Sequence, residues 1–471
     1  METEKNGSRL SGWLNKLQEF QGDKVILIIV LLLILISFLA IFSSTPLLPS
    51  QASRIATMKE HGIIAVFGIL VMFLLYRFDF KWIKYLSQAG FAVSFILLLL
   101  LLLRVDLGIL KVEVRNSAVR NFVFLGKQIH VFEIVKVAMV MYLAWAMNAI
   151  KEDMNARREK RKSETLRFGN WLAEQSPRLR FMKKTRGKRI LYVYIPSIII
   201  VMMLFFGSGS SSLFVGAVLI ALMIVGGVPL KELALAGFIG LAGIGSLVAI
   251  YELSDGKYVK RVATIINRLK ADYDMERLDN LKGDEFHNML DTLRQPISAK
   301  MAVHEGKLIG KGIGNSTQKY KVDNIYGDYM YSFIIEEYGL IGGILVLILY
   351  VSLLARSSII ARMCEDEFAK FAIGGLAILV SGQAFMHILV NVDIGPMTGQ
   401  TLPLISHGAS AFLVFCVAFG IMLSISRIAI SRLMVSDLHV GNDTSQIIME
   451  VQCLIIGIQP SGDPGNDLAD L

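Results

Sequence analysis

Hydrophobic residues in this chain are gathered into long blocks that are separated by polar segments. The first block runs from Val25 to Ala40, and Ser37 is its only polar residue. A helix of about 20 apolar residues crosses the hydrocarbon core of a bilayer, so blocks of this kind predict membrane spans. Ten spans are predicted, at residues 24–45, 61–78, 82–103, 133–150, 190–207, 210–227, 231–252, 330–355, 368–390 and 403–426.

The composition agrees with this pattern. Hydrophobic residues make up 54% of the chain and charged residues 18%, with a mean hydropathy of +0.56, whereas soluble domains are about a quarter charged. The three cysteines are scattered, which excludes a disulfide scaffold and a zinc ribbon. The first block follows a polar lead without a small-residue cleavage site, so we interpret it as an anchor and not as a removed signal peptide. The predicted fold class is an all-α polytopic membrane protein.

Charge predicts the topology. Segment 151–189 contains fourteen Lys or Arg and five Asp or Glu, and its net charge of +9 equals that of the whole chain. Because cytoplasmic loops carry an excess of Lys and Arg, we predict a cytoplasmic N-terminus (1–23), a ten-helix membrane domain (24–430) and a cytoplasmic tail (431–471). Topology accounts for the basic charge, so we expect contact with the lipid bilayer and no nucleic-acid binding.

One predicted outer segment is unusually long. Residues 253–329, between the seventh and eighth spans, form a large extracytoplasmic loop that is far longer than a connection requires. It mixes aromatic and aliphatic residues with charges, which favours a folded segment. In the span before it, Gly237, Gly240 and Gly243 are interpreted as a face for close helix packing.

The first group of residues with possible chemistry lies around the fourth span. Arg120 precedes this span, while Glu133 and Lys136 open it and, three residues apart, share one face of a helix. Two interpretations remain open. Glu133 and Lys136 form an ion pair that fixes the end of the helix, or Arg120 and Lys136 form a cationic pocket for an anionic group, with Glu133 holding Lys136 in place.

The second group lies at the end of the long loop. Segment 306–317 is rich in glycine and contains Lys311, as in a phosphate cradle, but it lacks the Walker A spacing and fits a plain turn better. Asp328 directly precedes the eighth span, where lipid-embedded and aqueous substrates can both reach it. Glu336 and Glu337 are predicted to lie within the bilayer, one of them facing the interior of the bundle.

The third group lies at the junction of the ninth and tenth spans. Its prolines, glycines and hydroxyl residues predict a broken helix against protein or a water-filled cavity. Thr398, Gly399, Thr401 and Ser406 are candidate substrate contacts in this junction. His407 follows Ser406 directly, but adjacent residues on a helix do not face each other, so we do not expect a Ser–His nucleophile.

These groups resemble the SEDS family (shape, elongation, division and sporulation: RodA, FtsW and SpoVE) over roughly residues 20–430. Three ordered blocks carry the resemblance: Asn116…Arg120 with Glu133 and Lys136; Gly306…Gly310-Lys311-Gly312…Ser316 with Asp328 and Glu336-Glu337-Tyr338-Gly339; and Gly382-Gln383 with Pro396-x-Thr398-Gly399-x-Thr401-Leu402-Pro403…Ser406…Gly408…Ser410. The chain departs from the family pattern at two places. The family usually has His-Thr before the acid, where Tyr326-Gly327 stand here. It usually has Phe-x-Ser-Tyr-Gly-Gly-Ser in the last block, where Leu404, His407 and Ala409 replace three members.

The resemblance implies a peptidoglycan glycosyltransferase that polymerises lipid II at the outer face of the bacterial cytoplasmic membrane. Asp328 would be the general base on the acceptor sugar hydroxyl, and Arg120, Lys136 and Lys311 would stabilise the polyprenyl diphosphate leaving group. A divalent cation, Mg or Mn, could share that duty, although the sequence contains no carboxylate cluster to hold one, and no metal ligand is predicted.

The resemblance also implies partners: lipid II and the growing glycan strand, a class B penicillin-binding protein (a transpeptidase), and other divisome or elongasome membrane proteins. Residues 334–339 and the long basic loop favour the FtsW branch, hence division at the septum, over a RodA-like elongation polymerase. We expect the transpeptidase to contact apolar surface on the eighth and ninth spans.

A different class of protein is the alternative: a lipid II flippase or transporter of the same fold. A flippase needs polar groups through the full depth of the membrane. Here they concentrate in the outer half, with Glu336 and His387 as partial exceptions, which favours the enzyme. A scaffold role toward the transpeptidase is compatible with either.

Overall fold

The structure is a computed structural model. It describes residues 20–45, 54–105, 110–115, 118–124, 127–161, 166–253, 284–322, 325–395 and 398–439. The chain divides into two compact units, of which one comprises Lys24–Ile425 and the other the two ends of the chain, Met1–Asp23 and Ser426–Leu471. Most of the predicted terminal segments 1–23 and 431–471, and residues 254–283 of the predicted outer loop, lie outside the described residues.

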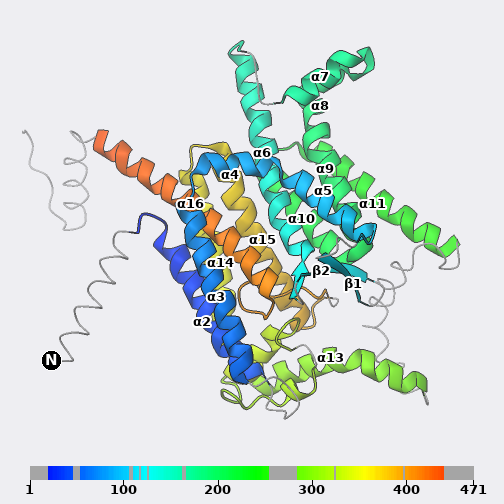
Figure 1. Cartoon of the computed structure of the whole chain (residues 1–471), viewed down its shortest axis with the longest axis vertical. Coiled ribbons are helices and arrows are strands. Elements are labelled where there is room, and N and C mark those ends of the chain that lie inside the picture. Colours follow the sequence, from blue (N-terminus) through cyan, green and yellow to red (C-terminus); the bar gives the residue numbers. More distant parts are fainter. Residues whose placement is uncertain are drawn as a thin grey trace, which may run out of the picture. The chain divides into compact units, whose positions relative to one another are not determined.

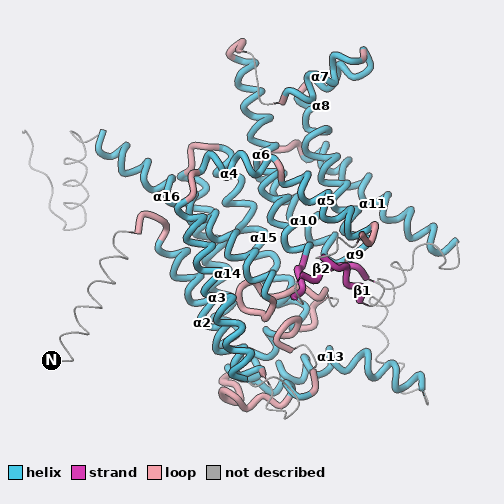
Figure 2. Tube along the Cα trace, viewed as in Figure 1, coloured by secondary structure: helices cyan, strands magenta, loops and turns pink. Residues whose placement is uncertain are grey.

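The described residues are mostly helical (Figures 1 and 2). The N-terminal helices are α2 (Lys24–Ser44), α3 (Arg54–Arg77), α4 (Phe80–Gln88), α5 (Gly90–Leu102) and α6 (Val131–Arg158). The middle of the chain contains α7 (Arg167–Gln175), α8 (Thr185–Arg189), a π-helical turn (Ile190–Tyr194), α9 (Ile195–Gly207), α10 (Gly209–Val225) and α11 (Leu230–Leu253). The last helices are α13 (Asp284–Gly306), α14 (Met330–Met363), α15 (Glu367–Asn391) and α16 (Ala409–His439).

Helical membrane architecture is confirmed. Among the described residues, seven helices are long and apolar enough to cross a membrane, and an eighth is counted if α4 and α5, bent by 46°, form one span. The apolar helix α10 is shorter. Each predicted span coincides with a described helix, while the total of ten spans and the position of the long loop remain predictions.

Several helices begin or end away from the predicted boundaries, for example α3, which begins at Arg54 where the prediction gave residue 61. The tenth span was placed from residue 403, but α16 begins at Ala409 because residues 398–408 form an irregular segment. The fourth span was placed at 133–150, but α6 continues to Arg158, beyond the apolar stretch. Polar residues at its end extend a helix that hydrophobicity alone would terminate.

A small antiparallel sheet, not predicted, precedes α6 (Figure 2). Its strands are β1 (Leu110–Arg115), β2 (Ala118–Phe124) and β3 (Lys127–His130), in the order β1-β2-β3. Leu110 pairs with Phe124 and Asn121 with His130. The alternation of apolar and polar residues in the sequence of β1 is the strand signal that could have revealed it.

Helices α6 and α15 form the centre of the core. They run side by side (Figure 1), and most residues of both are buried. Helix α6 also packs against α5 and α10, and α15 packs against α14. Polar side chains on these two central helices are therefore shielded from lipid, which is where membrane proteins keep functional polar groups.

Candidate active site

Asp328 lies in the turn 325–329 directly before α14, and its side chain is half-buried. The three successive backbone carbonyls of this turn all accept hydrogen bonds from the α15–α16 region. The donors are the His407 N–H to Tyr326 (2.8 Å), the Ser406 hydroxyl to Gly327 (2.8 Å) and the Asn391 amide to Asp328 (3.1 Å). Residues about 60 to 80 positions later in the chain thus fix the backbone that carries the carboxylate.

Gly399 faces the Asp328 carboxylate from the irregular segment. A Cβ built on Gly399 would lie 3.9 Å from Asp328 Oδ2, and Gly399 has a φ of +63°, which a side chain would strain. The preceding residue, Thr398, is buried, and its carbonyl accepts a hydrogen bond from the Ser210 hydroxyl of α10 (2.9 Å). The structure thus brings together the predicted residues Asp328, Thr398 and Gly399.

Ser406 is buried, and its hydroxyl forms two hydrogen bonds within the protein. Besides donating to Gly327, its hydroxyl accepts a hydrogen bond from the N–H of Leu402 (2.9 Å). Thr401 is half-buried, and its carbonyl accepts from the Gln383 side-chain amide (3.0 Å). Both residues hold the segment in shape, so a substrate contact through Ser406 remains a prediction.

Lys136 lies at the centre of a buried polar cluster, with 1% of its surface exposed. Its ammonium donates to Glu133 Oε1 (2.7 Å), Gln383 Oε1 (2.8 Å) and Gln400 Oε1 (2.6 Å). Since an ammonium has three hydrogens, each has a protein acceptor. The Glu133–Lys136 pair is therefore present, and a direct phosphate contact would require Lys136 to give up one of these bonds.

The cluster continues beyond residues that the sequence singled out. Gln400 also donates to the Ser211 hydroxyl (2.8 Å). His387 Nδ1–H donates to the carbonyl of Gln400 (2.7 Å), which leaves Nε2 to accept from the N–H of Tyr331 (3.4 Å). Gln383 and His387, four residues apart on one face of apolar α15, were the signal for this cluster. Helices α6, α10, α14 and α15 are thereby connected to the irregular segment.

Arg120 lies in β2, and the prediction for its side chain falls outside what the structure describes. Its sheet is joined to the last helix, because the N–H of His130, at the end of β3, donates to the Ser410 hydroxyl at the start of α16 (2.9 Å). The strand that contains Arg120 therefore belongs to the same end of the molecule as the irregular segment.

Helix α14 is broken at Gly339, where φ is +74°. The break frees backbone groups that a continuous helix would pair, and an unpaired group is costly at a membrane boundary. The glycine-rich segment pairs them. The N–H groups of Lys311 and Gly312 donate to the carbonyls of Glu336 (2.9 Å) and Glu337 (3.0 Å). The N–H groups of Leu340 and Ile341 donate to the carbonyls of Lys307 (2.9 Å) and Leu308 (3.3 Å).

The same segment surrounds the side chains of Glu336 and Glu337, both of which are buried. The Glu336 carboxylate accepts from the Ser316 hydroxyl (2.5 Å) and the Thr317 N–H (2.9 Å), and Glu337 accepts from the Ser43 hydroxyl (2.5 Å) and the Gly314 N–H (3.1 Å). The glycine-rich segment is thus an anion cradle and not the plain turn that its sequence favoured, and the anions are carboxylates of the protein.

The position of Glu336 within the bilayer remains a prediction, and the break at Gly339 bears on it. After the break, Leu340–Met363 alone contains 24 residues, about 36 Å of helix, which is enough to cross about 30 Å of hydrocarbon. The polar segment packed around Glu336 supports a span that begins after Gly339.

Lys311 is partly exposed (25%) and forms ion pairs with Glu305 and with Glu336 (3.0 Å). Partial burial opposes its charge, but the hydrogen bonds and charges of the two carboxylates outweigh burial and raise the pKa of Lys311. The hydrogen bond from Lys311 likewise lowers the pKa of Glu305. A phosphate contact by Lys311 remains a prediction, and it would compete with two carboxylates.

Within the described residues, no group of three or more His, Cys, Asp or Glu side chains is arranged to hold a metal ion. The divalent cation suggested by the resemblance therefore also remains a prediction.

The fold and the site define a polytopic helical membrane protein that holds a half-buried aspartate at one end of its helix bundle. Residues 23–430 match the model of the FtsW/RodA/SpoVE family, described as "Cell cycle protein". The chain belongs to this family, which confirms the resemblance seen in the sequence.

Individual relatives support the same family assignment. Stage V sporulation protein E of Bacillus subtilis (strain 168) is 25% identical over 409 residues, which cover 86% of this chain and 97% of the relative. A probable peptidoglycan glycosyltransferase FtsW from Xanthomonas oryzae pv. oryzae is 26% identical over 381 residues, which cover 80% of this chain and 67% of the relative.

Two solved structures share the fold. One, from work described as "Structural coordination of polymerization and crosslinking by a peptidoglycan synthase complex", has a TM-score of 0.57 at 19% identity and covers 87% of this chain and 98% of its own. The rod shape determining protein RodA of Thermus thermophilus has a TM-score of 0.50 at 18% identity and covers 86% and 97%.

Proposed function

We propose that this chain is a peptidoglycan glycosyltransferase that polymerises lipid II into glycan strands at the outer face of the cytoplasmic membrane, with both termini cytoplasmic. The observation that carries the proposal is the convergence on Asp328. The turn before α14, the end of α15 and the irregular segment 398–408 together hold one half-buried carboxylate beside Gly399. The family membership and the glycosyltransferase names of the relatives support it.

In the proposed reaction, Asp328 removes the proton from the acceptor sugar hydroxyl while the oxygen of that hydroxyl attacks the anomeric carbon of the donor. A new C–O bond forms, and the bond between the anomeric carbon and the diphosphate oxygen breaks. The polyprenyl diphosphate leaves with the electron pair. A positioned general base contributes roughly 10²–10⁴-fold.

The cations have different proposed duties. Lys311 and Arg120 are the candidates for stabilising the leaving diphosphate, alone or with a divalent cation. Lys136 positions the irregular segment, because its ammonium is committed to Glu133, Gln383 and Gln400. Of the four predicted contacts in the segment, Thr401 and Gly399 are the two that are not buried, and they are the proposed substrate contacts.

Hydrogen bonds of two polar side chains, Glu336 and His387, support the enzyme over the flippase. A transport path needs polar groups that a passing head group can contact through the depth of the membrane. Glu336 and His387 were the exceptions to the concentration of polar groups in the outer half of the membrane, and both side chains bond to the protein itself.

The proposed partner is a class B penicillin-binding protein, which would contact an apolar stripe on α14. Exposed side chains repeat along one face of this helix at Ile341, Leu345, Ile348 and Val351, whereas α15 is mostly buried and offers less surface. We propose the division septum as the site of action, with the elongation machinery as the alternative.

The test is polymerisation of purified lipid II in liposomes that also contain the transpeptidase, comparing wild type with Asp328→Asn. We expect product formation to fall by about 10²-fold or more, because the amide cannot accept the proton. The matched control is Asp393→Asn, which removes an exposed acid that pairs with Lys300 (2.6 Å). Equal activity of wild type and Asp328→Asn would exclude Asp328 as the base. Lipid translocation without any strands would favour the transporter.

A further inference from the structure

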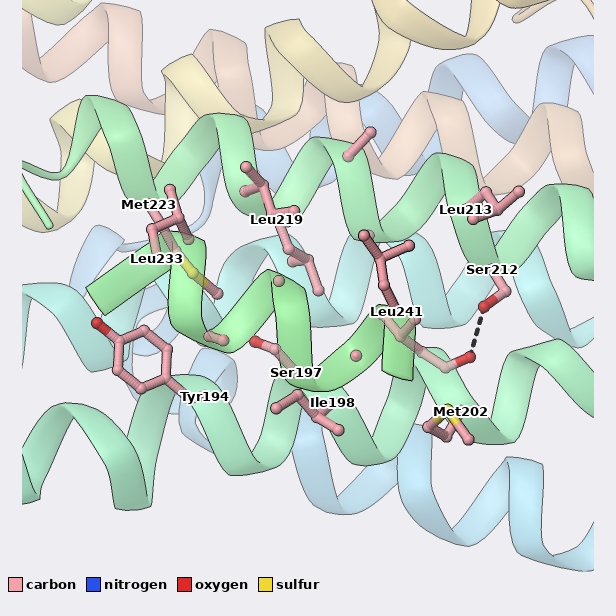
Figure 3. Close-up of a pocket in the computed structure, with 17 residues that line it drawn as sticks. Tyr194, Ser197, Ile198, Met202, Ser212, Leu213, Leu219, Met223, Leu233 and Leu241 are labelled. Carbon is pink, nitrogen blue, oxygen red and sulfur yellow. Dashed lines mark hydrogen bonds between the residues drawn. The ribbon is translucent and has the colours of Figure 1, made fainter. Parts of the chain in front are cut away.

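A second feature lies away from Asp328, between α9, α10 and α11. It is a cavity of about 290 Å³ whose wall is mostly apolar. Figure 3 shows Ile198 and Met202 of α9, Leu219 and Met223 of α10, and Leu241 of α11 around it. The cavity runs along the helices from Tyr194 at one end to Ser212 at the other (Figure 3). The eleven helical steps from Ser212 to Met223 of α10 correspond to about 16 Å.

Glycines on α11 create part of this space. A Cβ built on Gly237 or on Gly240 would have no described heavy atom within 4 Å, and both residues line the cavity. The prediction of close helix packing at these two positions was therefore wrong. At Gly243 the Cβ would lie 3.8 Å from Met202, an ordinary contact. The small residues leave room instead of drawing helices together.

One polar group is left unpaired inside the cavity wall. Ser197 is only 6% exposed, and its hydroxyl has no hydrogen-bond partner among the described residues. A buried hydroxyl without a partner is unfavourable and unusual. An occupant that offers an oxygen acceptor near Ser197 would satisfy it.

The end of the cavity near Tyr194 is next to positive charge. The Tyr194 hydroxyl donates to Glu232 Oε2 (3.0 Å), and Glu232 also accepts from Arg186 (3.0 Å) and Arg189 (3.3 Å). Two guanidinium groups share one carboxylate, and Arg186 is 74% exposed. This end adjoins the basic segment 151–189, which is predicted to be cytoplasmic.

We propose that the cavity binds one acyl chain of an anionic glycerophospholipid of the inner leaflet. The order of groups along the helices matches the order of groups in such a lipid. The arginines would bind the phosphate, the Ser197 hydroxyl would donate to the ester carbonyl, and the apolar wall would surround the chain. Basic pockets between membrane helices on the cytoplasmic side are typical sites for anionic head groups.

The position of the charge decides which lipid is bound. A polyprenyl diphosphate awaiting polymerisation would carry its phosphates at the outer face, near Asp328, but the arginines lie at the opposite, basic end. The site is therefore a structural lipid site, and it does not depend on the glycosyltransferase assignment.

The first test measures phospholipid retained by the full chain after extraction from vesicles of equal phosphatidylglycerol and phosphatidylcholine, using native mass spectrometry. We expect wild type to retain one phosphatidylglycerol. Gly240→Leu fills the cavity and should abolish retention. Gly245→Leu is the matched control, because Gly245 also has open space around its Cβ but does not line the cavity. Equal retention by a monodisperse Gly240→Leu would overturn the proposal.

The second test removes the charge of the two arginines that pair with Glu232. Each arginine near an anionic surface is worth about 1 kcal/mol, so Arg186→Gln with Arg189→Gln should lower the preference for phosphatidylglycerol by roughly tenfold or more. It should leave binding of phosphatidylcholine unchanged. If wild type retained the two lipids equally, the proposal of an anionic head group would be overturned, whatever the behaviour of Gly240→Leu.

Discussion

Lys136 and Lys311 were both predicted as cations for the leaving diphosphate, and the structure places them in two different clusters. Lys136 is almost fully buried and bonds one carboxylate and two amides, which belong to the helix core and the irregular segment. Lys311 is partly exposed and pairs with two carboxylates at the glycine-rich segment. In each case a lysine near the candidate site fixes a segment of backbone. The difference in burial should make the two clusters respond very differently to mutation.

The largest effect is expected at the buried cluster. Lys136→Met leaves the Glu133 carboxylate and two amide oxygens buried without their donor, and breaking a buried pair in this way destabilises a protein by about 3–5 kcal/mol. We expect a large fall in the melting temperature and loss of polymerisation. Thermal unfolding in detergent measures the fall in melting temperature.

Lys151→Met is the control, because Lys151 lies on the same helix in a partly exposed pair with Glu367, where an ion pair is worth about 1 kcal/mol or less. Similar losses for the two variants would show that burial does not separate these pairs. Adding Glu133→Gln to Lys136→Met should recover part of the stability.

The next-largest effect is expected at Gly339, where the backbone of the glycine-rich segment pairs with the broken helix α14. Gly339→Ala puts a Cβ 2.2 Å from the carbonyl oxygen of Leu308 at a positive φ, a conformation that costs about 1–3 kcal/mol even without a clash. We expect the glycine-rich segment to detach and proteolysis within it to increase. Gly374→Ala, at a helical glycine of α15 with open space around it, should be neutral or slightly stabilising. An unchanged cleavage pattern for Gly339→Ala would contradict the role of the break.

A third prediction concerns the two departures from the SEDS pattern. Tyr326 and His407 are in edge-to-face contact at 5.6 Å, and the two ring types stand in the reverse order to the family pattern. We expect Tyr326→His and His407→Tyr each to lower polymerisation by roughly tenfold, and the double exchange to restore most of it. Contacting residues typically couple by about 0.5–3 kcal/mol. A double variant as impaired as the sum of the single ones would show that the rings act independently.

The smallest effect is expected at the exposed side of the Lys311 cluster. Lys311 lowers the pKa of Glu305 below its ordinary value of 4.5. The pair therefore stabilises the protein above that pH, and the contribution disappears as the pH falls through the lowered pKa. Glu305→Gln should remove this part of the acid sensitivity, a change of at most about 1 kcal/mol. Melting temperatures between pH 3 and pH 6 measure it, and identical pH profiles would contradict it.

The sequence predicted the parts of the molecule that depend on local periodicity. Hydrophobic blocks located the helices, and a spacing of three residues identified the Glu133–Lys136 pair. Position before a span singled out Asp328, whose role as the base remains a proposal. The partners of the glycine-rich segment could not be predicted, because Lys311 pairs with Glu336, 25 residues later, only after α14 breaks at Gly339.

Other features depended on tertiary arrangement. The sequence of α11 shows small residues at regular spacing, which suits close packing and open space equally well, and only the positions of α9 and α10 distinguish them. Gln383 and Gln400 become important because they meet at Lys136 from two elements. The sheet before α6 was missed because the prediction searched mainly for spans, although β1 alternates as a strand should.

The break at Gly339 also affects how the protein is made. In the sequence, Asp328 lies between the two partners of this contact, the segment 307–312 and residues 336–341, so backbone hydrogen bonds close a ring of chain that contains Asp328. That ring can close only after both partners have emerged on the same side of the membrane and the span from Leu340 has been inserted. During synthesis, the turn that carries Asp328 is therefore completed late, after the end of α15 and the segment 398–408 have been made, because they donate the hydrogen bonds that fix its backbone.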